Sequence, residues 1–224
     1  MEQIAGQIQN FATEEQLHEW SFALSKIDAI TIRHNDCHGV NEEHVFYNWF
    51  MENIFSNIKN LIADQNLVPT FGMYLNETKP WGIHTDGYHV HQDPTRKPAI
   101  SFLMPLSVDN KQDLVSQSHT IVFNQSSDTI TIKDDIDTKE YNNRAMVSLD
   151  DVSAMPDSAM HIYKKHLSHN VVEDVQRMTV QGVYQWTRGS LIWWQGQYFH
   201  DTDNFLANGH TSKQALVIHT HYEV

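Results

Sequence analysis

From residue 70 to the C-terminus, the sequence is dominated by short apolar segments whose side chains alternate between two faces. This period of two is typical of β-strands that bury one face. In residues 178–187, Val180 and Tyr184 would share one face, with Gln181 on the other. Seven segments are predicted as strands: residues 70–76, 99–108, 120–124, 129–133, 178–187, 191–194 and 215–222. Seven short strands with few long helices between them favour an antiparallel sandwich of the jelly-roll type.

The first 69 residues carry helical signals instead. Residues 13–16 read Thr-Glu-Glu-Gln, the form of a capping box, and predict a short helix through Trp20. A strand is predicted over residues 27–33, followed by a longer helix from about residue 42 to residue 63. Apolar residues recur along this helix at three- to four-residue spacing: Phe46, Phe50, Ile54, Ile58 and Leu61. We therefore expect residues 1–69 to support a jelly-roll core of residues 70–224 with helices packed outside its sheet.

Residues 134–175 interrupt the strand pattern with charged residues and one candidate short helix over residues 158–167. This insert is either a loop that covers a substrate or a solvated excursion. No internal repeat or low-complexity linker divides the chain, and 224 residues with 40 % hydrophobic content suffice for one substantial core. We expect a single domain over residues 1–224.

The charge and cysteine content exclude several classes of protein. A formal net charge of −13 disfavours nonspecific binding to nucleic acid or to anionic lipid, since both require Lys and Arg to neutralise phosphate. Cys37 is the one cysteine, so an intramolecular disulfide and thiolate-rich metal sites are excluded. The N-terminal residues lack a basic region leading into an apolar run, and no apolar stretch is long enough to cross a bilayer. We expect a cytoplasmic protein with no membrane partner.

Three residues are candidate ligands of one metal ion. In an extended segment, side chains two residues apart project to the same side, so His84 and Asp86 can grip one ion. A buried strand over residues 191–194 delivers the chain to His200, which would supply the third ligand. Two histidines and one carboxylate on one face of an ion, with open positions opposite, are associated with non-heme Fe(II) and O2 chemistry.

The order and spacing of four residues, His84, Asp86, His200 and Lys213, resemble those of the Fe(II)/2-oxoglutarate-dependent oxygenases, the superfamily that includes prolyl 4-hydroxylase-like and phytanoyl-CoA hydroxylase-like enzymes. The resemblance covers roughly residue 70 to the C-terminus. It implies a double-stranded β-helix fold, Fe(II) bound by the first three residues, and 2-oxoglutarate and O2 as cosubstrates. It also implies hydroxylation of a C–H bond with release of succinate and CO2, in a small-molecule or side-chain substrate that the sequence does not identify. Relatives that halogenate carry a small residue in place of the carboxylate, so Asp86 favours hydroxylation or a related oxidation.

The resemblance implies that Lys213 holds the distal carboxylate of 2-oxoglutarate. The family usually has Arg at this position, often followed two residues later by a hydroxyl side chain, whereas this chain has Lys213 and Ala215. Lysine cannot offer the bidentate fork of arginine, so the anchor would need help from a neighbouring side chain. Tyr74, on the strand before the His84 motif, is the candidate for this role, because the family often uses a tyrosine there.

Other histidines compete with these assignments. His89 and His91 could imitate the metal pair of a cupin, although no suitably placed glutamate follows them. His166 and His169 lie at the end of the predicted short helix, where positive charge suits the helix dipole and no metal is needed. His219 and His221 are alternatives to His200 as the distal ligand, but no following strand would supply a carboxylate anchor.

Two other classes of function stay open at this stage. One is a cupin-type metalloprotein that uses a different metal set and no 2-oxoglutarate. The other is a non-catalytic jelly-roll binding module in which aromatic residues form a stacking surface for sugars or bases, namely Trp81, Tyr88, Trp193 and Trp194. Succinate production from 2-oxoglutarate that depends on Fe(II) would separate the oxygenase from both.

Overall fold

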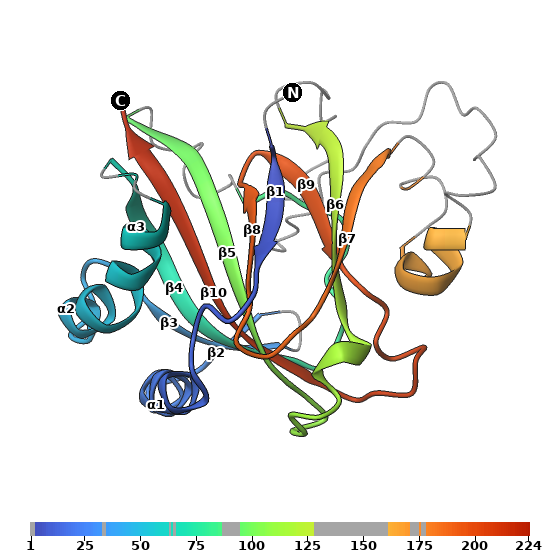
Figure 1. Cartoon of the computed structure of the whole chain (residues 1–224), viewed down its shortest axis with the longest axis horizontal. Helices are drawn as coiled ribbons and strands as arrows, with labels where there is room; N and C mark the ends of the chain where they lie inside the picture. The colour runs from blue at the N-terminus through green and yellow to red at the C-terminus, as the bar shows by residue number, and fades with distance from the viewer. Residues whose placement is uncertain are drawn as a thin grey trace.

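The computed structural model describes residues 3–32, 35–62, 64, 66–86, 95–127, 161–170, 175 and 178–224. Within these ranges two antiparallel sheets face one another (Figure 1). The larger sheet has seven strands in the order β1 (Ala5–Ile8), β8 (Leu191–Gln195), β5 (Arg96–Val108), β10 (Lys213–Glu223), β4 (Val68–Glu77), β3 (Asn35–Val40) and β2 (Ile30–Ile32). The smaller sheet has the order β7 (Val180–Gln185), β6 (His119–Ser126) and β9 (Tyr198–Thr202). This mainly antiparallel β fold with flanking helices is the double-stranded β-helix expected from the sequence.

Seven predicted strands are present: the segment 27–33 as β2, and the later segments as β4, β5, β6, β7, β8 and β10, each within a few residues of its predicted ends. The strand predicted over residues 129–133 lies outside the described residues. The sequence pattern missed β1, β3 and β9, the last of which follows β8 after Gly196 and Gln197. Three residues of β9 are polar yet buried, His200, Asp201 and Thr202, so hydrophobic alternation gave no sign of the strand.

The N-terminal residues supply strands as well as helices. The capping box is confirmed: the Thr13 hydroxyl accepts a hydrogen bond from the Gln16 amide at 3.2 Å, and the Gln16 side chain accepts one from the Thr13 amide at 2.9 Å. It starts helix α1 (Glu14–Leu24), which continues past the predicted end because Leu24 packs in the core. The longer predicted helix is α2 (Tyr47–Phe50), the π-helical turn η1 (Met51–Phe55) and α3 (Ser56–Ile62) in succession, and it begins later than expected.

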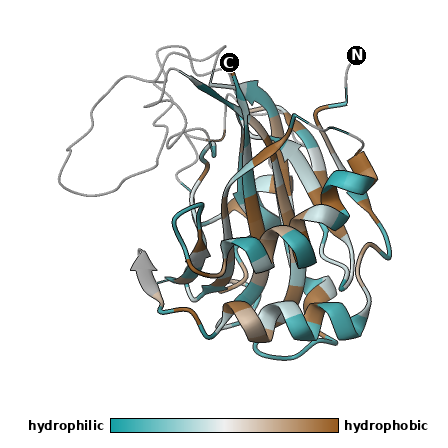
Figure 2. Ribbon diagram, turned by 90° about the vertical axis from the view of Figure 1, so that its left-hand side faces the viewer, coloured by the Kyte–Doolittle hydropathy of each residue, from teal (hydrophilic) through white to brown (hydrophobic). Residues whose placement is uncertain are grey.

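Helices α1, α2 and α3 cover one face of the larger sheet, seen from the helix side in Figure 2, and the smaller sheet covers the other face (Figure 1). On the helix side, Phe50 and Ile54 pack in one buried cluster with Phe102 of β5 and Ile218 of β10. Between the sheets, a second cluster joins larger-sheet residues to smaller-sheet and adjoining residues: Leu75, Leu103, Ala215, Val217, Val122, Trp186 and Trp194. The side chains of β4, β5 and β10 therefore alternate between a helix-facing side and a side that faces the interior between the two sheets.

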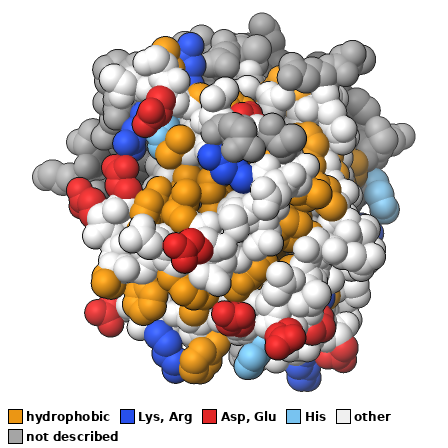
Figure 3. Space-filling model, turned by 60° about the vertical axis from the view of Figure 1, so that its left-hand side comes forward, with side chains coloured by type: hydrophobic (Ala, Val, Ile, Leu, Met, Phe, Trp, Pro, Cys, Tyr) orange, Lys and Arg blue, Asp and Glu red, His pale blue; other side chains and the backbone are white. Residues whose placement is uncertain are grey.

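The short 3₁₀-helix η2 (Val115–Gln117) leads into β6, and the π-helical turn η3 (Tyr163–Leu167) packs on the outer side of the smaller sheet. The predicted helix over residues 158–167 is observed from residue 161, and most of the predicted insert lies outside the described residues. On the face shown in Figure 3, acidic side chains are scattered among exposed hydrophobic ones. In the described part of the chain, no helix combines the length and the apolar character required to cross a membrane.

Gly72 shows how closely the helical layer approaches the sheet. A Cβ atom at this position would lie 2.5 Å from ring carbons of Phe50, which packs directly on β4. We predict that Gly72→Ala lowers the free energy of unfolding by about 1–3 kcal/mol, because the buried ring must move to admit the methyl group. Chemical denaturation measures this loss. Gly196→Ala is the control, since its Cβ contacts would be 3.4 Å or longer; equal stability of the two variants would contradict the prediction.

Candidate metal centre

Backbone pairing brings the candidate ligands together. The His84 amide donates to the His200 carbonyl at 3.1 Å, and the His200 amide donates to the His84 carbonyl at 2.9 Å. Two residues further on, the Asp86 amide donates to the Gly196 carbonyl at 3.1 Å. Residues 84–86 therefore run antiparallel to β9 and the turn before it, which places the two histidines directly opposite each other.

The three side chains converge as this pairing requires. Ligand atoms of His84, Asp86 and His200 all lie within 4.8 Å of one another. The Asp86 Oδ1 atom is 3.4 Å from His200 Nε2 and 3.9 Å from His84 Nε2. All three side chains are largely buried, with exposed fractions of 7 % for Asp86 and His200 and 19 % for His84. The structure thus gathers two imidazoles and one carboxylate in a site partly shielded from water.

Hydrogen bonds to backbone carbonyls orient both imidazole rings. His84 Nδ1 lies 2.7 Å from the carbonyl oxygen of Gly82, and His200 Nδ1 lies 3.3 Å from that of Tyr198. A carbonyl can only accept, so each Nδ1 carries a proton, and Nε2, the ring nitrogen that faces Asp86, is the atom left to bind a metal. Protein histidines that bind metals are usually held in this way by a second hydrogen bond. The donor set fits a divalent transition-metal ion such as Fe(II).

Asp86 is oriented by Trp194 of β8. The indole Nε1–H donates to Asp86 Oδ2 at 2.8 Å, and the ring of Trp194 lies 4.5 Å from that of His200. His219 Nδ1 is 3.5 Å from the same Oδ2 atom and 3.0 Å from the Ser101 hydroxyl. Both neighbours approach Oδ2, so Oδ1 remains directed toward the two histidines.

The protonation states follow from burial and from the charges within the site. Burial, together with the neighbouring His200 charge, lowers the pKa of His84 to about 3, so the His84 imidazole is neutral. Burial by itself would raise the pKa of Asp86, but His200 and His219 reverse this effect and hold it well below its usual value. For His200, burial lowers the pKa, and the Asp86 charge and hydrogen bond outweigh that and raise it. Metal binding would therefore displace a proton from His200.

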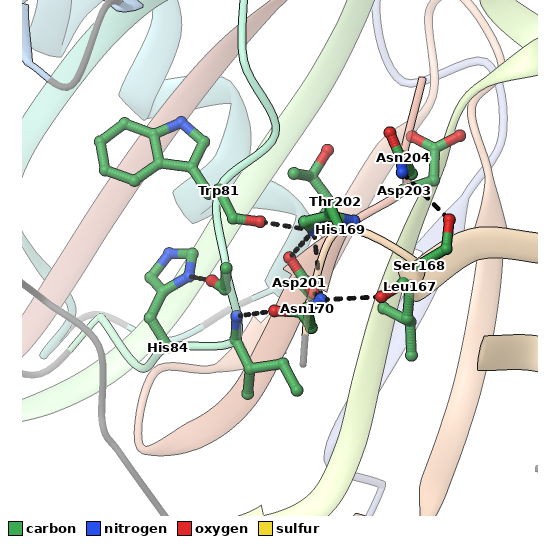
Figure 4. A network of polar contacts seen from close by, with 12 residues as sticks. Trp81, His84, Leu167, Ser168, His169, Asn170, Asp201, Thr202, Asp203 and Asn204 are labelled. Carbon is green, nitrogen blue, oxygen red and sulfur yellow. Dashed lines mark hydrogen bonds and ion pairs between the residues drawn. The ribbon is translucent and has the colours of Figure 1, made fainter. Parts of the chain in front are cut away.

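A second polar network holds the segment that carries His84 (Figure 4). His169 Nε2 lies 2.8 Å from the Trp81 carbonyl, and the Asn170 side-chain oxygen accepts the Ile83 amide at 3.2 Å. The same two residues bind Asp201, at 3.3 Å from His169 Nε2 and 2.6 Å from Asn170 Nδ2. Strand β9 therefore positions His200 directly and the His84 segment through this network.

Lys213 and Tyr74, the two predicted cosubstrate residues, lie on opposite faces of the larger sheet. Lys213 is 1 % exposed, and its Nζ lies 3.1 Å from Glu77 Oε2, 3.7 Å from Asp203 Oδ1 and 4.4 Å above the ring of Trp186. Tyr74 pairs with Leu216 across β4 and β10 and packs in the helix-side cluster. The structure therefore does not bring Tyr74 to the centre, because its position along β4 directs its side chain away from the interior.

Of the competing histidines, His219 lies beside the centre, at the second oxygen of Asp86. His221 instead lies 2.8 Å from the Thr70 hydroxyl through its Nδ1. His89 and His91 lie outside the described residues, as does Tyr88. Trp193 packs in the helix-side cluster while Trp194 packs between the sheets, so the two do not form one stacking surface.

Sequence reasoning missed several residues that surround the predicted ones. Glu77 ends β4 and pairs with Lys213 across the two strands. Asp203 follows β9 and lies close to Lys213 as well as to His119 and His166. The sequence held one signal: Asp201 and Asp203 stand two positions apart just after His200, so an extended segment would place both carboxylates on one side.

We predict that Trp194→Phe weakens Fe(II) binding by about 10–100-fold, the usual effect of removing a hydrogen bond that orients a ligand. The variant keeps an aromatic ring at this position but leaves Asp86 Oδ2 without the indole donor. Anaerobic titration with Fe(II) or Co(II) measures the change. Trp193→Phe, one residue away on the opposite face of β8, is the matched control; equal affinities of the two variants would contradict this role of Trp194.

No protein-family model and no curated protein matches the sequence. Solved structures do match its fold. EvdO2 from Micromonospora carbonacea var. aurantiaca is 11 % identical, with a TM-score of 0.55 over 98 % of this chain and 86 % of its own. The non-heme alpha ketoglutarate dependent epimerase SnoN from nogalamycin biosynthesis is 9 % identical, with a TM-score of 0.54 over 98 % of this chain and 78 % of its own. The carbocyclase SnoK from the same biosynthesis is 11 % identical, with a TM-score of 0.53 over 99 % of this chain and 80 % of its own. The chain therefore has the fold of the Fe(II)/2-oxoglutarate-dependent oxygenases.

Proposed function

We propose that this protein is an Fe(II)- and 2-oxoglutarate-dependent dioxygenase that hydroxylates a C–H bond of a small molecule. The observation that carries the proposal is the convergence of His84, Asp86 and His200, with both Nε2 atoms directed toward Asp86 Oδ1. Three ligands on one face of an octahedral ion leave the opposite positions for other molecules. The fold, shared with α-ketoglutarate-dependent enzymes, supports the same conclusion.

In this proposal, bound iron, 2-oxoglutarate and O2 supply the oxidising chemistry and yield succinate and CO2. The chain itself holds the metal, excludes water and binds the cosubstrate. Trp194 and Trp81 shield the ligands, since Trp194 lies against His200 and the Trp81 ring is 6.0 Å from that of His84. Lys213 is the proposed anchor of the distal carboxylate, because it is a buried cation that faces the interior between the sheets.

In the structure, Lys213 already pairs with two protein carboxylates, those of Glu77 and Asp203. A cosubstrate carboxylate would have to share this ammonium with two protein carboxylates. Burial raises the pKa of Glu77, while Lys213 partly opposes this effect. If Glu77 takes up a proton, one of the two carboxylates that compete for Lys213 becomes neutral. The site is then compatible with the distal carboxylate of 2-oxoglutarate.

Hydroxylation is proposed because the carboxylate ligand Asp86 is intact. The epimerase and carbocyclase named above have the same fold, so product analysis must accompany any assay of turnover. One SnoN structure contains Fe3+, alpha ketoglutarate and nogalamycin RO, which supports a small-molecule substrate here. We also propose a cytoplasmic location, since Cys37 is the one cysteine of the sequence and a free thiol, which fits a reducing compartment.

We expect the protein to convert 2-oxoglutarate slowly to succinate without a prime substrate, in a reaction that requires Fe(II) and O2. His200→Ala should abolish this conversion, because two remaining ligands retain Fe(II) poorly. Succinate is measured by mass spectrometry after anaerobic loading with Fe(II). His221→Ala is the matched control on β10 and should keep the activity, since His221 lies at Thr70. Full activity of His200→Ala would transfer the distal ligand role to another histidine. No succinate from the wild-type protein would argue for a cupin-type metalloprotein or a binding module instead.

Replacement of Lys213 tests the cosubstrate anchor. We predict that Lys213→Met raises the 2-oxoglutarate requirement by tens-fold, the loss of a charge-assisted hydrogen bond worth about 1.5–3 kcal/mol, with Fe(II) affinity nearly unchanged. Because Glu77 loses its partner, the variant should also lose about 3–5 kcal/mol of folding free energy. Adding Glu77→Gln to it should restore part of the stability but not the 2-oxoglutarate affinity. A stable double variant with the wild-type requirement would remove Lys213 from the site.

A further inference from the structure

A second cluster of two histidines and one carboxylate lies outside the centre described above. His119 begins β6, His166 belongs to η3, and Asp203 directly follows β9. Their ligand atoms all lie within 4.8 Å of one another. His119 Nδ1 is 3.6 Å from Asp203 Oδ2, and the rings of His119 and His166 are 4.5 Å apart. None of these three residues belongs to the set that would bind iron.

The polar atoms of this cluster are buried without hydrogen-bond partners. His119 Nδ1, His166 Nδ1 and Asp203 Oδ2 each lack one. Leaving a buried polar group unpaired costs about 1–3 kcal/mol, so three together in one place call for a physical explanation. His210 provides a contrast: its two ring nitrogens lie 2.9 Å from Asp109 Oδ2 and 2.9 Å from Gln117 Oε1, so both nitrogens of this buried histidine are paired.

The surrounding structure holds the three side chains in place. The Asp203 amide donates to the His119 carbonyl at 3.2 Å, and the Asn204 amide donates to the His166 carbonyl at 2.7 Å. The Ser118 hydroxyl donates to Asp203 Oδ1 at 2.7 Å, which leaves Oδ2 directed toward the histidines. The segment of η3 that carries His166 is π-helical, a geometry often found at functional sites.

The local charge favours a cation. Glu77, Asp201 and Asp203 are buried close to Lys213, which is the one buried Lys or Arg among the described residues. Hydrogen bonds and charges around Asp203 lower its pKa against the effect of burial, so it remains ionised. Burial lowers the pKa of His166 to about 4, aided by His119 and Lys165, so its imidazole is neutral.

We propose that His119, His166 and Asp203 form a second divalent-metal site, of the kind that takes Zn²⁺, with water at the remaining position. Imidazole nitrogen and carboxylate oxygen suit Zn²⁺, and a site with three protein ligands and one water is common. Two ligand atoms about 2.1 Å from one ion at a tetrahedral angle are about 3.4 Å apart. The His119–Asp203 separation of 3.6 Å agrees with this spacing. The bound ion would attach η3 to the smaller sheet and so steady the Leu167–Asn170 segment that supports His84.

The test uses the full chain with the first centre removed by His84→Ala and His200→Ala, so that its result does not depend on the proposed activity. After metal is stripped with a chelator, Zn²⁺ bound per chain is measured by equilibrium dialysis and elemental analysis. We expect one equivalent. Adding His166→Gln, or separately His119→Gln, should weaken this binding at least 10-fold. Adding His210→Gln, which replaces a buried histidine outside both clusters, should leave it unchanged.

Circular dichroism establishes that each variant is folded. Binding of no Zn²⁺ by the parent double variant, or retention of full affinity in folded His166→Gln and His119→Gln chains, would overturn the proposal. If neither glutamine variant folds, the melting temperature of the parent decides: a stabilising shift with Zn²⁺, reversed by chelator, supports the site, and no shift overturns it.

Discussion

The pair of backbone hydrogen bonds between His84 and His200 is the constraint on which the candidate centre depends. A loop beside one sheet is thereby fixed to a strand of the other sheet, and two imidazoles that are far apart in sequence come to lie with their ring centroids 4.3 Å apart. The placement of the Asp86 side chain then follows from the extended backbone alone, since side chains two residues apart project to the same side. The polar network of His169, Asn170 and Asp201 holds the same segment at the backbone of the residues just before His84. Main-chain pairing thus brings the three side chains of the centre together, and they need only small rotations to reach one ion.

Strand β9 and the residue after it are unusual because they are polar and buried. His200, Asp201 and Asp203 each serve a different neighbour: the first centre, the network behind His84 and the second cluster. Buried charges of this kind add little net stability, because desolvation offsets most of their attraction. Their presence around Lys213 is better understood as a requirement of binding than of folding. The hydrophobic contacts of the three buried clusters supply the stability that such a strand lacks.

The sequence predicted what depends on local geometry. The period of two identified most strands, the Thr13–Gln16 signal identified the start of α1, and the His84–Asp86 spacing identified two side chains on one side of a segment. It could not show which face Tyr74 occupies, because a shift of one residue along a strand reverses the face. The Lys213–Glu77 contact and the cluster at His119 join residues distant in the chain, and only the paired sheets bring them together. Strand β9 was not predicted because most of its buried residues are polar, so they do not form a hydrophobic pattern.

The two adjacent tryptophans of β8 have a spectroscopic consequence. Trp194 donates to Asp86 and lies against His200, whereas Trp193 faces the helices. An open-shell ion held by these ligands would quench the emission of the inner indole far more than that of the outer one. Trp194 is therefore an intrinsic optical reporter, and filling of the centre can be followed in the unlabelled protein by its own ultraviolet fluorescence.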